Sequence, residues 1–65
     1  MVNGAKLIDC RKKSGFKAYE IAQKIGVKRQ ALYQYEREQR TPSVKRLEKL
    51  ADLYGISINE LLKKD

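Results

Sequence analysis

The sequence predicts an all-α protein of five short helices and no strands, folded as a single domain over residues 1–65. Apolar residues recur with the period of a helix, and glycine or proline separates the periodic segments. The connections are about 2–6 residues long, as in a compact helical bundle. With one cysteine and no histidine, neither a disulfide nor a zinc site is expected to support the core. The predicted helices span residues 5–14, 18–25, 29–37, 44–54 and 57–62.

The first three helices are short, and each is expected to turn one face inward. Gly15 ends the first helix, and Gly26 ends the second at a sharp turn that favours positive φ. Gly26 and Val27 leave room only for a tight turn before the third helix. Cys10 occupies the position of a small buried apolar residue on the first helix. The inward side chains are expected to be Leu7, Cys10, Ile21, Ala22, Ile25, Leu32 and Tyr35.

The last two helices carry clear signals at their ends. Pro42 cannot lie inside a helix, and Ser43 is suited to cap the fourth helix, which Gly55 ends. Ser57, with Glu60 three residues later, forms a capping box that opens the fifth helix. The fourth helix follows the i, i+3, i+4, i+7 rule, with apolar residues at Val44, Leu47, Leu50, Ala51 and Tyr54.

Composition excludes several classes of function. No apolar run approaches the roughly 20 residues that span a bilayer, and the first residues lack the apolar core of a secretion signal. We therefore expect a cytoplasmic protein with no membrane contact. The absence of histidine, a cysteine expected to be buried and the lack of paired carboxylates leave no plausible catalytic set. The expectation is a protein that is not an enzyme and that holds no metal and no cofactor.

The net charge of +7 is unevenly distributed along the chain. Ten of the 15 Lys and Arg residues lie in residues 1–40, against four of the eight acidic residues. This excess favours a polyanionic partner, although charge alone does not distinguish such a partner from a solvated surface. The third helix adds a more specific signal. Long hydrogen-bonding side chains on one exposed helix face suit the reading of base edges in a major groove, and this face holds Arg29, Gln30, Tyr33 and Gln34.

Four motifs occur in a fixed order along the chain. They are Ala22…Gly26-Val27, Tyr35-Glu36-Arg37, Arg40-Thr41-Pro42-Ser43 and Leu47…Leu50-Ala51…Tyr54-Gly55-Ile56-Ser57…Glu60-Leu61-Leu62. In order and spacing they resemble the phage repressor and Cro family of helix-turn-helix DNA-binding domains, the Xre-type regulators with a lambda-repressor-like fold. The resemblance covers residues 7–62 and implies a helix-turn-helix formed by the second and third helices.

The resemblance implies a role for each group of polar residues. Arg29 and Gln30 are the leading base readers, because arginine pairs with guanine and glutamine with adenine. Gln34 is third, and Tyr33 packs on a thymine methyl, reaches a phosphate or has no role. Arg11 is expected to form a partly buried ion pair with Glu36 rather than to bind phosphate. The expected phosphate contacts are Lys17, Tyr19, Lys28, Arg37, Arg40 and Thr41.

The function implied is sequence-specific binding of double-stranded DNA by a transcriptional regulator, in the first place a repressor. One recognition helix reads few base pairs, so a homodimer on a palindromic operator is expected. The dimer interface is expected at Ile56, Ile58, Leu61 and Leu62. The competing interpretation places these four residues in the intramolecular core. No small-molecule ligand is expected, so a protein antagonist, proteolysis or a change in concentration would switch the protein. The alternative is a protein-interaction module, such as a DNA-binding antitoxin of a toxin pair or of another mobile element.

The sequence departs from the family pattern at the two helix starts of this unit. Relatives usually begin the second helix with Thr or Ser followed by a phosphate-binding Gln, where this chain has Lys17 and Ala18. The third helix, usually capped by Ser or Thr, here has Lys28 at the cap position. Each lost cap costs on the order of 1 kcal/mol, and a lysine at the positive end of a helix adds about a few tenths of a kcal/mol. Our hypothesis is that stability is given up here for attraction of phosphates.

Replacing Lys17 with Thr and Lys28 with Ser tests this hypothesis. The double variant is expected to melt at a higher temperature, because both caps return. It is also expected to bind DNA more weakly and with a flatter salt dependence, because two cations are lost. Thermal unfolding and DNA titrations at several salt concentrations measure these effects. Tighter binding by the double variant would contradict the hypothesis.

Overall fold

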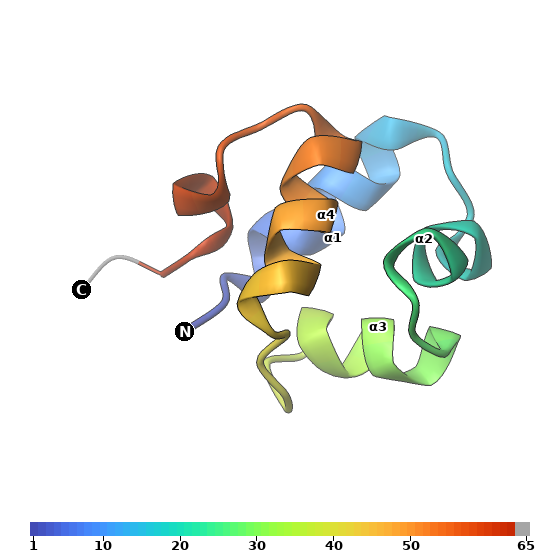
Figure 1. Cartoon of the computed structure of the whole chain (residues 1–65), viewed down its shortest axis with the longest axis horizontal. Coiled ribbons are helices and arrows are strands. Elements are labelled where there is room, and N and C mark those ends of the chain that lie inside the picture. The colour runs from blue at the N-terminus through green and yellow to red at the C-terminus, as the bar shows by residue number, and fades with distance from the viewer. Residues whose placement is uncertain (64–65) are drawn as a thin grey trace.

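Four α-helices and one 3₁₀ turn make up residues 1–63, the part of the chain that the computed structural model describes. In Figure 1, α4 crosses in front of α1, and α2 and α3 form a pair beside them. No helix in this part of the chain is both long and apolar enough to cross a membrane. The elements are α1 (Gly4–Ser14), α2 (Ala18–Ile25), α3 (Arg29–Glu36), α4 (Val44–Tyr54) and the 3₁₀ turn η1 (Ile58–Leu61).

The helix ends lie close to the predicted positions. Gly15, Gly26 and Gly55 end α1, α2 and α4 with φ values of 78°, 79° and 69°, which confirms their left-handed conformation. At the start of α4, the Ser43 hydroxyl accepts a hydrogen bond of 3.2 Å from the Arg46 amide, as predicted. The start of α1 lies one residue earlier than predicted, because the Asn3 side chain accepts a 3.1 Å hydrogen bond from the Lys6 amide and caps it.

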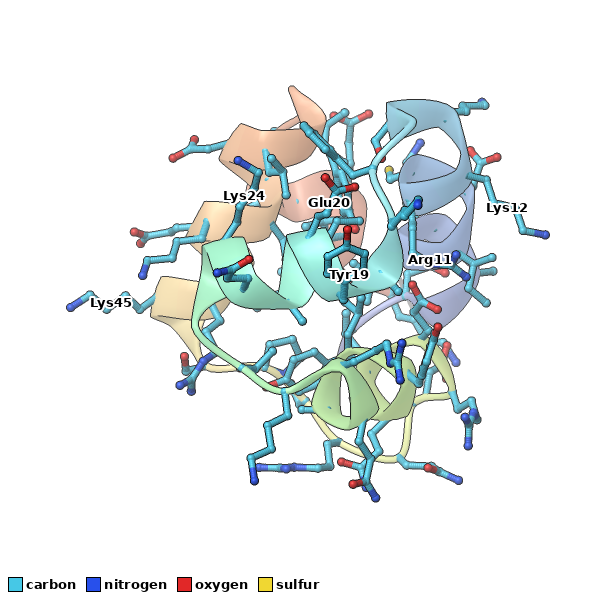
Figure 2. All side chains as sticks on the ribbon, turned by 90° about the vertical axis from the view of Figure 1, so that its right-hand side faces the viewer. Arg11, Lys12, Tyr19, Glu20, Lys24 and Lys45 are labelled. Carbon is cyan, nitrogen blue, oxygen red and sulfur yellow. The ribbon has the colours of Figure 1, made fainter. Side chains whose placement is uncertain are left out.

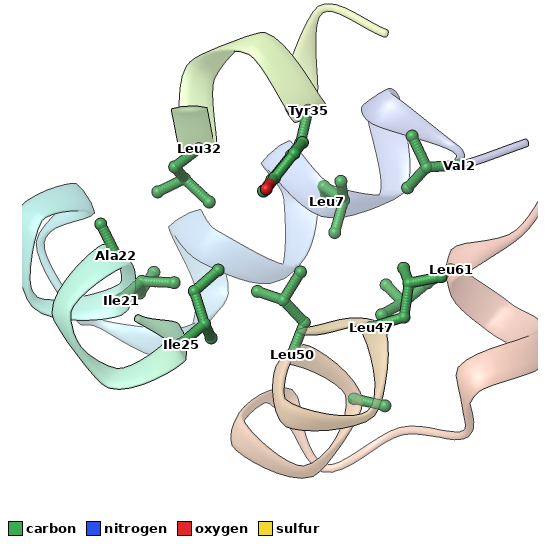
Figure 3. Packing of buried hydrophobic residues seen from close by; sticks show 11 residues of the cluster. Val2, Leu7, Ile21, Ala22, Ile25, Leu32, Tyr35, Leu47, Leu50 and Leu61 are labelled. Carbon is green, nitrogen blue, oxygen red and sulfur yellow. The ribbon is translucent and has the colours of Figure 1, made fainter. Parts of the chain in front are cut away.

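The core lies where the four helices meet, and it agrees with the predicted inward faces except at Val44, Cys10 and Tyr54, the last of which is only partly buried (Figure 3). Val44 was expected to face inward, but its side chain is 66% exposed. It is the first residue of α4, so it lies at the outer end of the helix, ahead of the turns that pack. Cys10 is only half-buried. The buried hydrophobic residues are Val2, Leu7, Ile21, Ala22, Ile25, Leu32, Tyr35, Leu47, Leu50, Ala51 and Leu61.

The predicted fifth helix is the main difference from the sequence analysis. It is a 3₁₀ turn of four residues, and the chain is extended again at Leu62, with φ −103° and ψ 145°. Leu62 forms an antiparallel β-bridge with Val2. Backbone hydrogen bonds from Asn3 to Leu61 (2.7 Å) and from Lys63 to Met1 (2.8 Å) flank this bridge. Pairing with the N-terminal segment therefore holds the backbone extended where a helix would otherwise continue.

An ion pair connects α1 to the last turn of α3. Arg11 Nε lies 2.7 Å from Glu36 Oε2, and Arg11 Nη2 lies 3.2 Å from Glu36 Oε1. The Glu36 side chain is 3% exposed and the Arg11 side chain 23%. A carboxylate buried to this degree needs a fixed counter-charge, because the interior solvates a lone charge poorly. The guanidinium of Arg11 supplies that charge with two parallel hydrogen bonds.

Arg11→Ala is expected to lower the free energy of unfolding by about 3–5 kcal/mol, because the Glu36 carboxylate would stay buried without its partner. Chemical denaturation monitored by circular dichroism measures the change. The exposed pair between Asp9 and Lys13, 3.1 Å apart on α1, provides the control. Lys13→Ala should change stability by less than about 1 kcal/mol. A loss at Arg11 as small as the loss at Lys13 would show that the buried pair contributes little.

Candidate nucleic-acid interface

The turn between α2 and α3 gives the two helices their fixed relation. Gly26 leaves α2 in the left-handed conformation, and the Val27 amide returns a 2.9 Å hydrogen bond to the Ala22 carbonyl. Ala22 is 2% exposed. Its small side chain lets α3 pack closely over α2, where Leu32 and Tyr35 of α3 enter the core. The inner face of α3 is therefore packed in the core, and its outer face is left accessible.

The outer face of α3 presents the predicted base-reading residues to different degrees. Arg29 and Gln30 are exposed, whereas Tyr33 and Gln34 are half-buried. Side chains with nitrogen and oxygen ends project from α3 away from the other helices in Figure 2. The structure thus brings Arg29 and Gln30 together at the start of the helix, where a groove of DNA could reach both. Gln34 lies one turn further along.

Tyr33 makes a contact that the sequence analysis did not anticipate. The guanidinium carbon of Arg11 lies 5.9 Å from the centre of the Tyr33 ring. Within this distance a cation is attracted to the face of an aromatic ring. Tyr33 therefore contacts the arginine of the Arg11–Glu36 pair. Packing against Arg11 is a structural role for Tyr33 that was not among the predicted alternatives, which were a thymine contact, a phosphate contact or no role.

Two titratable side chains in or beside the ion pair keep one charge state near neutral pH. The hydrogen bond to Glu36 raises the pKa of Arg11. Burial, and then the negative charge of Glu36, raises the pKa of Tyr54 on α4. The Tyr54 hydroxyl is buried and has no hydrogen-bond partner among residues 1–63. Arg11 thus stays charged and Tyr54 neutral over the physiological range, and the sequence contains no histidine to titrate there.

A polar groove of about 440 Å³ runs between the start of α3 and the start of α4. Arg46 of α4 lines it, and its Nη2 lies 3.4 Å from the Gly26 carbonyl at the end of α2. Arg46 was not among the predicted DNA contacts, because the fourth helix was expected to serve only as scaffold. Its position three residues after the Ser43 cap was the available signal, since this places it in the first turn, near the preceding connection. The long polar side chains of the groove are Lys28, Gln30, Gln34, Arg40 and Arg46.

The two lysines at the helix starts lie where predicted, and α2 has a compensation that α3 lacks. Lys17 and Lys28 are the residues before α2 and α3, and neither side chain forms a capping hydrogen bond. The Glu20 carboxylate accepts a 2.7 Å hydrogen bond from the Lys17 amide, which gives α2 half of a capping box. No acidic residue lies in the first turn of α3. The positive end of α3 is therefore the less neutralised of the two.

The remaining predicted phosphate contacts are on the surface. Tyr19 is 52% exposed on α2 and is labelled in Figure 2. Arg37, Arg40 and Thr41 are exposed in the connection between α3 and α4. Arg40 Nη1 lies 3.5 Å from Gln34 Oε1, so this arginine lies beside the outer face of α3. The predicted phosphate contacts thus lie on α2 and along both ends of α3.

One of the four residues expected at a dimer interface cannot serve there. Leu61 is 0% exposed and belongs to the core, so it offers no surface to a second copy. The reason is that η1 turns Leu61 inward. Ile56, Ile58 and Leu62 pack against the core but remain partly exposed. The expectation of an interface is thereby restricted to these three residues.

The sequence matches a helix-turn-helix family, HTH_3, over residues 7–61. The HTH-type transcriptional regulator ImmR of Bacillus subtilis (strain 168) is 39% identical over 62 residues, which are 95% of this chain and 49% of ImmR. The uncharacterized SPbeta prophage-derived HTH-type regulator YonR of the same strain is 35% identical over 60 residues, which are 92% of this chain and 56% of YonR. The chain thus spans about half the length of these relatives.

Solved structures of similar proteins share the whole arrangement of helices. The P22 c2 repressor, solved in complex with a synthetic operator, superposes with a TM-score of 0.89 at 28% identity, covering 100% of this chain and 98% of that one. The N-terminal DNA-binding domain of SinR from Bacillus subtilis gives a TM-score of 0.80 at 33% identity, covering 95% and 91%. The family match covers residues 7–61, from α1 to the end of η1. The chain therefore belongs to this helix-turn-helix family, of the phage-repressor or Xre type.

Proposed function

We propose that this protein binds double-stranded DNA sequence-specifically and regulates transcription as a repressor that occludes a promoter. The observation that carries the proposal is the division of α3 into a packed inner face and an outer face with exposed Arg29 and Gln30. The P22 c2 repressor, which has the same fold, was solved with an operator. The matched relatives are named as transcriptional regulators, a class distinct from enzymes.

In this proposal Arg29 and Gln30 read bases from the start of α3. A guanidinium donates two hydrogen bonds to O6 and N7 of guanine, and an amide pairs with N6 and N7 of adenine. Both side chains are exposed and lie at the end of the helix that would enter the major groove first. Gln34 and Tyr33 extend the reading surface along α3, with Tyr33 limited by its contact with Arg11.

The phosphates would be bound on both sides of this helix. Lys17 and Tyr19 at α2 would contact one stretch of backbone, and Lys28 a position close to it. The groove beside α3 brings Lys28 together with Arg40 and Arg46, so it concentrates positive charge where a phosphate would pass. Such contacts set the position of the protein on the duplex without reading its sequence. Arg37 and Thr41 are further candidates for phosphate contacts.

A homodimer on a palindromic operator would give the selectivity that one α3 lacks. Two recognition helices about 34 Å apart would enter successive major grooves on one side of the duplex. The half-buried apolar residues near the C-terminal end offer the surface for such a dimer, namely Ile56, Ile58 and Leu62. Because these residues also pack against the core, the exposed apolar area is small, and DNA would contribute to assembly.

Selection of bound duplexes from a random library tests the proposal. The proposal predicts different outcomes for the substitution of Arg29 and of Arg40. Arg29→Ala is expected to lose about 1–3 kcal/mol of binding free energy on the selected duplex and to relax preference at one base position. Arg40→Ala is expected to weaken all duplexes about equally and to reduce the salt slope by about one. Titrations of selected and unrelated duplexes at several salt concentrations measure both.

Lys12→Ala provides the matched control, because the substitution also removes one positive charge. Lys12 is exposed and projects outward from α1 (Figure 2). Its effect on binding should be small and independent of sequence. If Arg29→Ala and Arg40→Ala both lost affinity without any change in base preference, the assignment of Arg29 to base reading would be wrong. A wild-type chain that enriched no sequence would contradict the proposed function itself.

A further inference from the structure

Glu38, in the connection after α3, has an unusual backbone conformation. Its φ is 61°, and among residues 1–63 it is the only residue other than glycine with positive φ. A side chain with a Cβ disfavours this left-handed region. Here it ends α3, where the amides of Glu38 and Gln39 donate to the carbonyls of Tyr35 and Gln34. Glycine usually occupies this position of a helix end, so the glutamate is the feature to be explained.

The Glu38 carboxylate contacts Gly4 on one side and Lys63 on the other. Oε2 accepts a 2.9 Å hydrogen bond from the Gly4 amide at the start of α1. Oε1 lies 2.5 Å from Nζ of Lys63. Lys63 is itself bonded through its amide to the Met1 carbonyl, beside the bridge between Val2 and Leu62. One side chain of the α3–α4 connection thus joins the N-terminal and C-terminal segments.

Gly4 shows how closely these segments approach α3. A Cβ on Gly4 would lie 2.2 Å from the Glu36 carbonyl oxygen and 2.9 Å from Cγ of Glu38. Only glycine permits this approach, so the first turn of α1 lies directly on the last turn of α3. The contact adds to the ion pair between Arg11 and Glu36, which holds the same turn from another side.

We propose that Glu38 is a positioning residue for DNA binding. Through Gly4 and Lys63 it holds the backbone that carries Arg37 and Arg40, so that both guanidinium groups meet the phosphates at the end of α3. We name the three residues Gly4, Glu38 and Lys63 the terminal clasp. The inference rests on the proposed function, because it assigns Glu38 a part in the phosphate contacts of that same surface.

Electrostatics makes the sign of the effect diagnostic. Glu38 is a negative charge between two arginines that are proposed to contact phosphates. If it were only a solvated surface charge, its removal would strengthen binding to a polyanion. If it positions the connection, its removal weakens binding in spite of the gain in net positive charge. The two roles therefore predict opposite changes in affinity.

The titration of Glu38 is consistent with a held carboxylate. The ammonium of Lys63, and then the Gly4 amide, lower the pKa of Glu38 below its ordinary value. Because the folded-state pKa lies below the unfolded one, the contribution of the clasp is present above the unfolded pKa. It is lost as pH falls through the folded pKa. The clasp is thus intact at neutral pH, where the binding experiment is performed.

The experiment compares three variants on two duplexes. Glu38→Gly removes both side-chain contacts and relaxes the backbone, so the variant should fold. Glu38→Gln keeps an acceptor for the Gly4 amide and loses the charge pair with Lys63. Glu48→Gln, at an exposed position on α4, changes net charge by the same amount and serves as the control. The probes are the duplex that the wild-type chain selects from a random library and one unrelated duplex.

Binding is measured at neutral pH and well below the melting temperature, so that loss of folded protein does not enter. Glu38→Gly is expected to bind the selected duplex roughly five- to tenfold more weakly than the wild type, a difference of about 1–1.4 kcal/mol. The affinity of Glu38→Gln for the selected duplex is expected to lie between those of Glu38→Gly and the wild type. Glu48→Gln is expected to bind as tightly as the wild type or slightly more tightly.

Hydrogen exchange provides a readout that a uniform loss of stability would not reproduce. The amides of Arg37 and Gln39 donate to the carbonyls of Tyr33 and Gln34 at 3.0 and 2.8 Å. In Glu38→Gln, which keeps the Cβ and loses the charge pair with Lys63, these amides are expected to exchange faster, while those in the middle of α4 keep their protection. A change shared equally by both regions would overturn the positioning role.

The outcomes for the inference and for the proposed function are distinguishable. If the wild-type chain selects a duplex, and both Glu38 variants bind it as tightly as Glu48→Gln does, the positioning role is overturned and the proposed function stands. If the wild-type chain enriches no sequence, the proposed function is overturned, and the clasp falls with it as a device for DNA binding.

Discussion

The ion pair between Arg11 and Glu36 connects the helix that would read DNA to the rest of the domain. α3 has only eight residues, and isolated helices shorter than about 12–15 residues are marginal in water. Its conformation and direction must therefore come from tertiary contacts. Leu32 and Tyr35 hold its inner face in the core, but apolar packing tolerates small rotations about the helix axis. The two parallel hydrogen bonds of the ion pair do not, because their geometry requires both groups in one orientation. The buried Glu36 carboxylate thus sets the rotation of α3, and with it the direction in which the outer face points.

Positive charge gathers around the start of α3 more than around the start of α2. An exposed lysine precedes both α2 and α3, at the positive N-terminal end of each helix. Glu20 neutralises part of this charge at α2 by accepting the Lys17 amide. The first turn of α3 has no acidic residue, and the groove beside it gathers Lys28, Arg40 and Arg46. The electrostatic attraction for an anion is therefore concentrated at the start of α3. On the proposed function, the charges that draw in the phosphates also bring the base-reading residues to the groove.

Most of the helices could be predicted from the sequence, because their ends and inward faces depend on local spacing. Gly26 is an example, since a glycine after an apolar repeat identifies both the end of α2 and its left-handed turn. The errors arose where distant parts of the chain decide. Leu62 is extended because it pairs with the N-terminal segment, and no local pattern contains that partner. Val44 fits the helical period but lies beyond the packed turns. Glu38 was missed at the candidate site for the same reason, because its contacts with Gly4 and Lys63 join residues far apart in sequence, whereas Arg46 had a local signal in its distance from the Ser43 cap.

The pairing of the two chain ends gives this small domain a constraint that its core alone would not supply. Val2 from the N-terminal segment and Leu61 from η1 enter the same core as Leu32 of α3. The backbone hydrogen bonds from Asn3 to Leu61 and from Lys63 to Met1 join these two segments, so neither can leave without the other. Displacing either segment would expose a core residue and also release the end of α3. Residues 1–3 and 61–63 thus take part in holding an eight-residue helix in one orientation. On the proposed function, both terminal segments belong to the support of the DNA-reading surface.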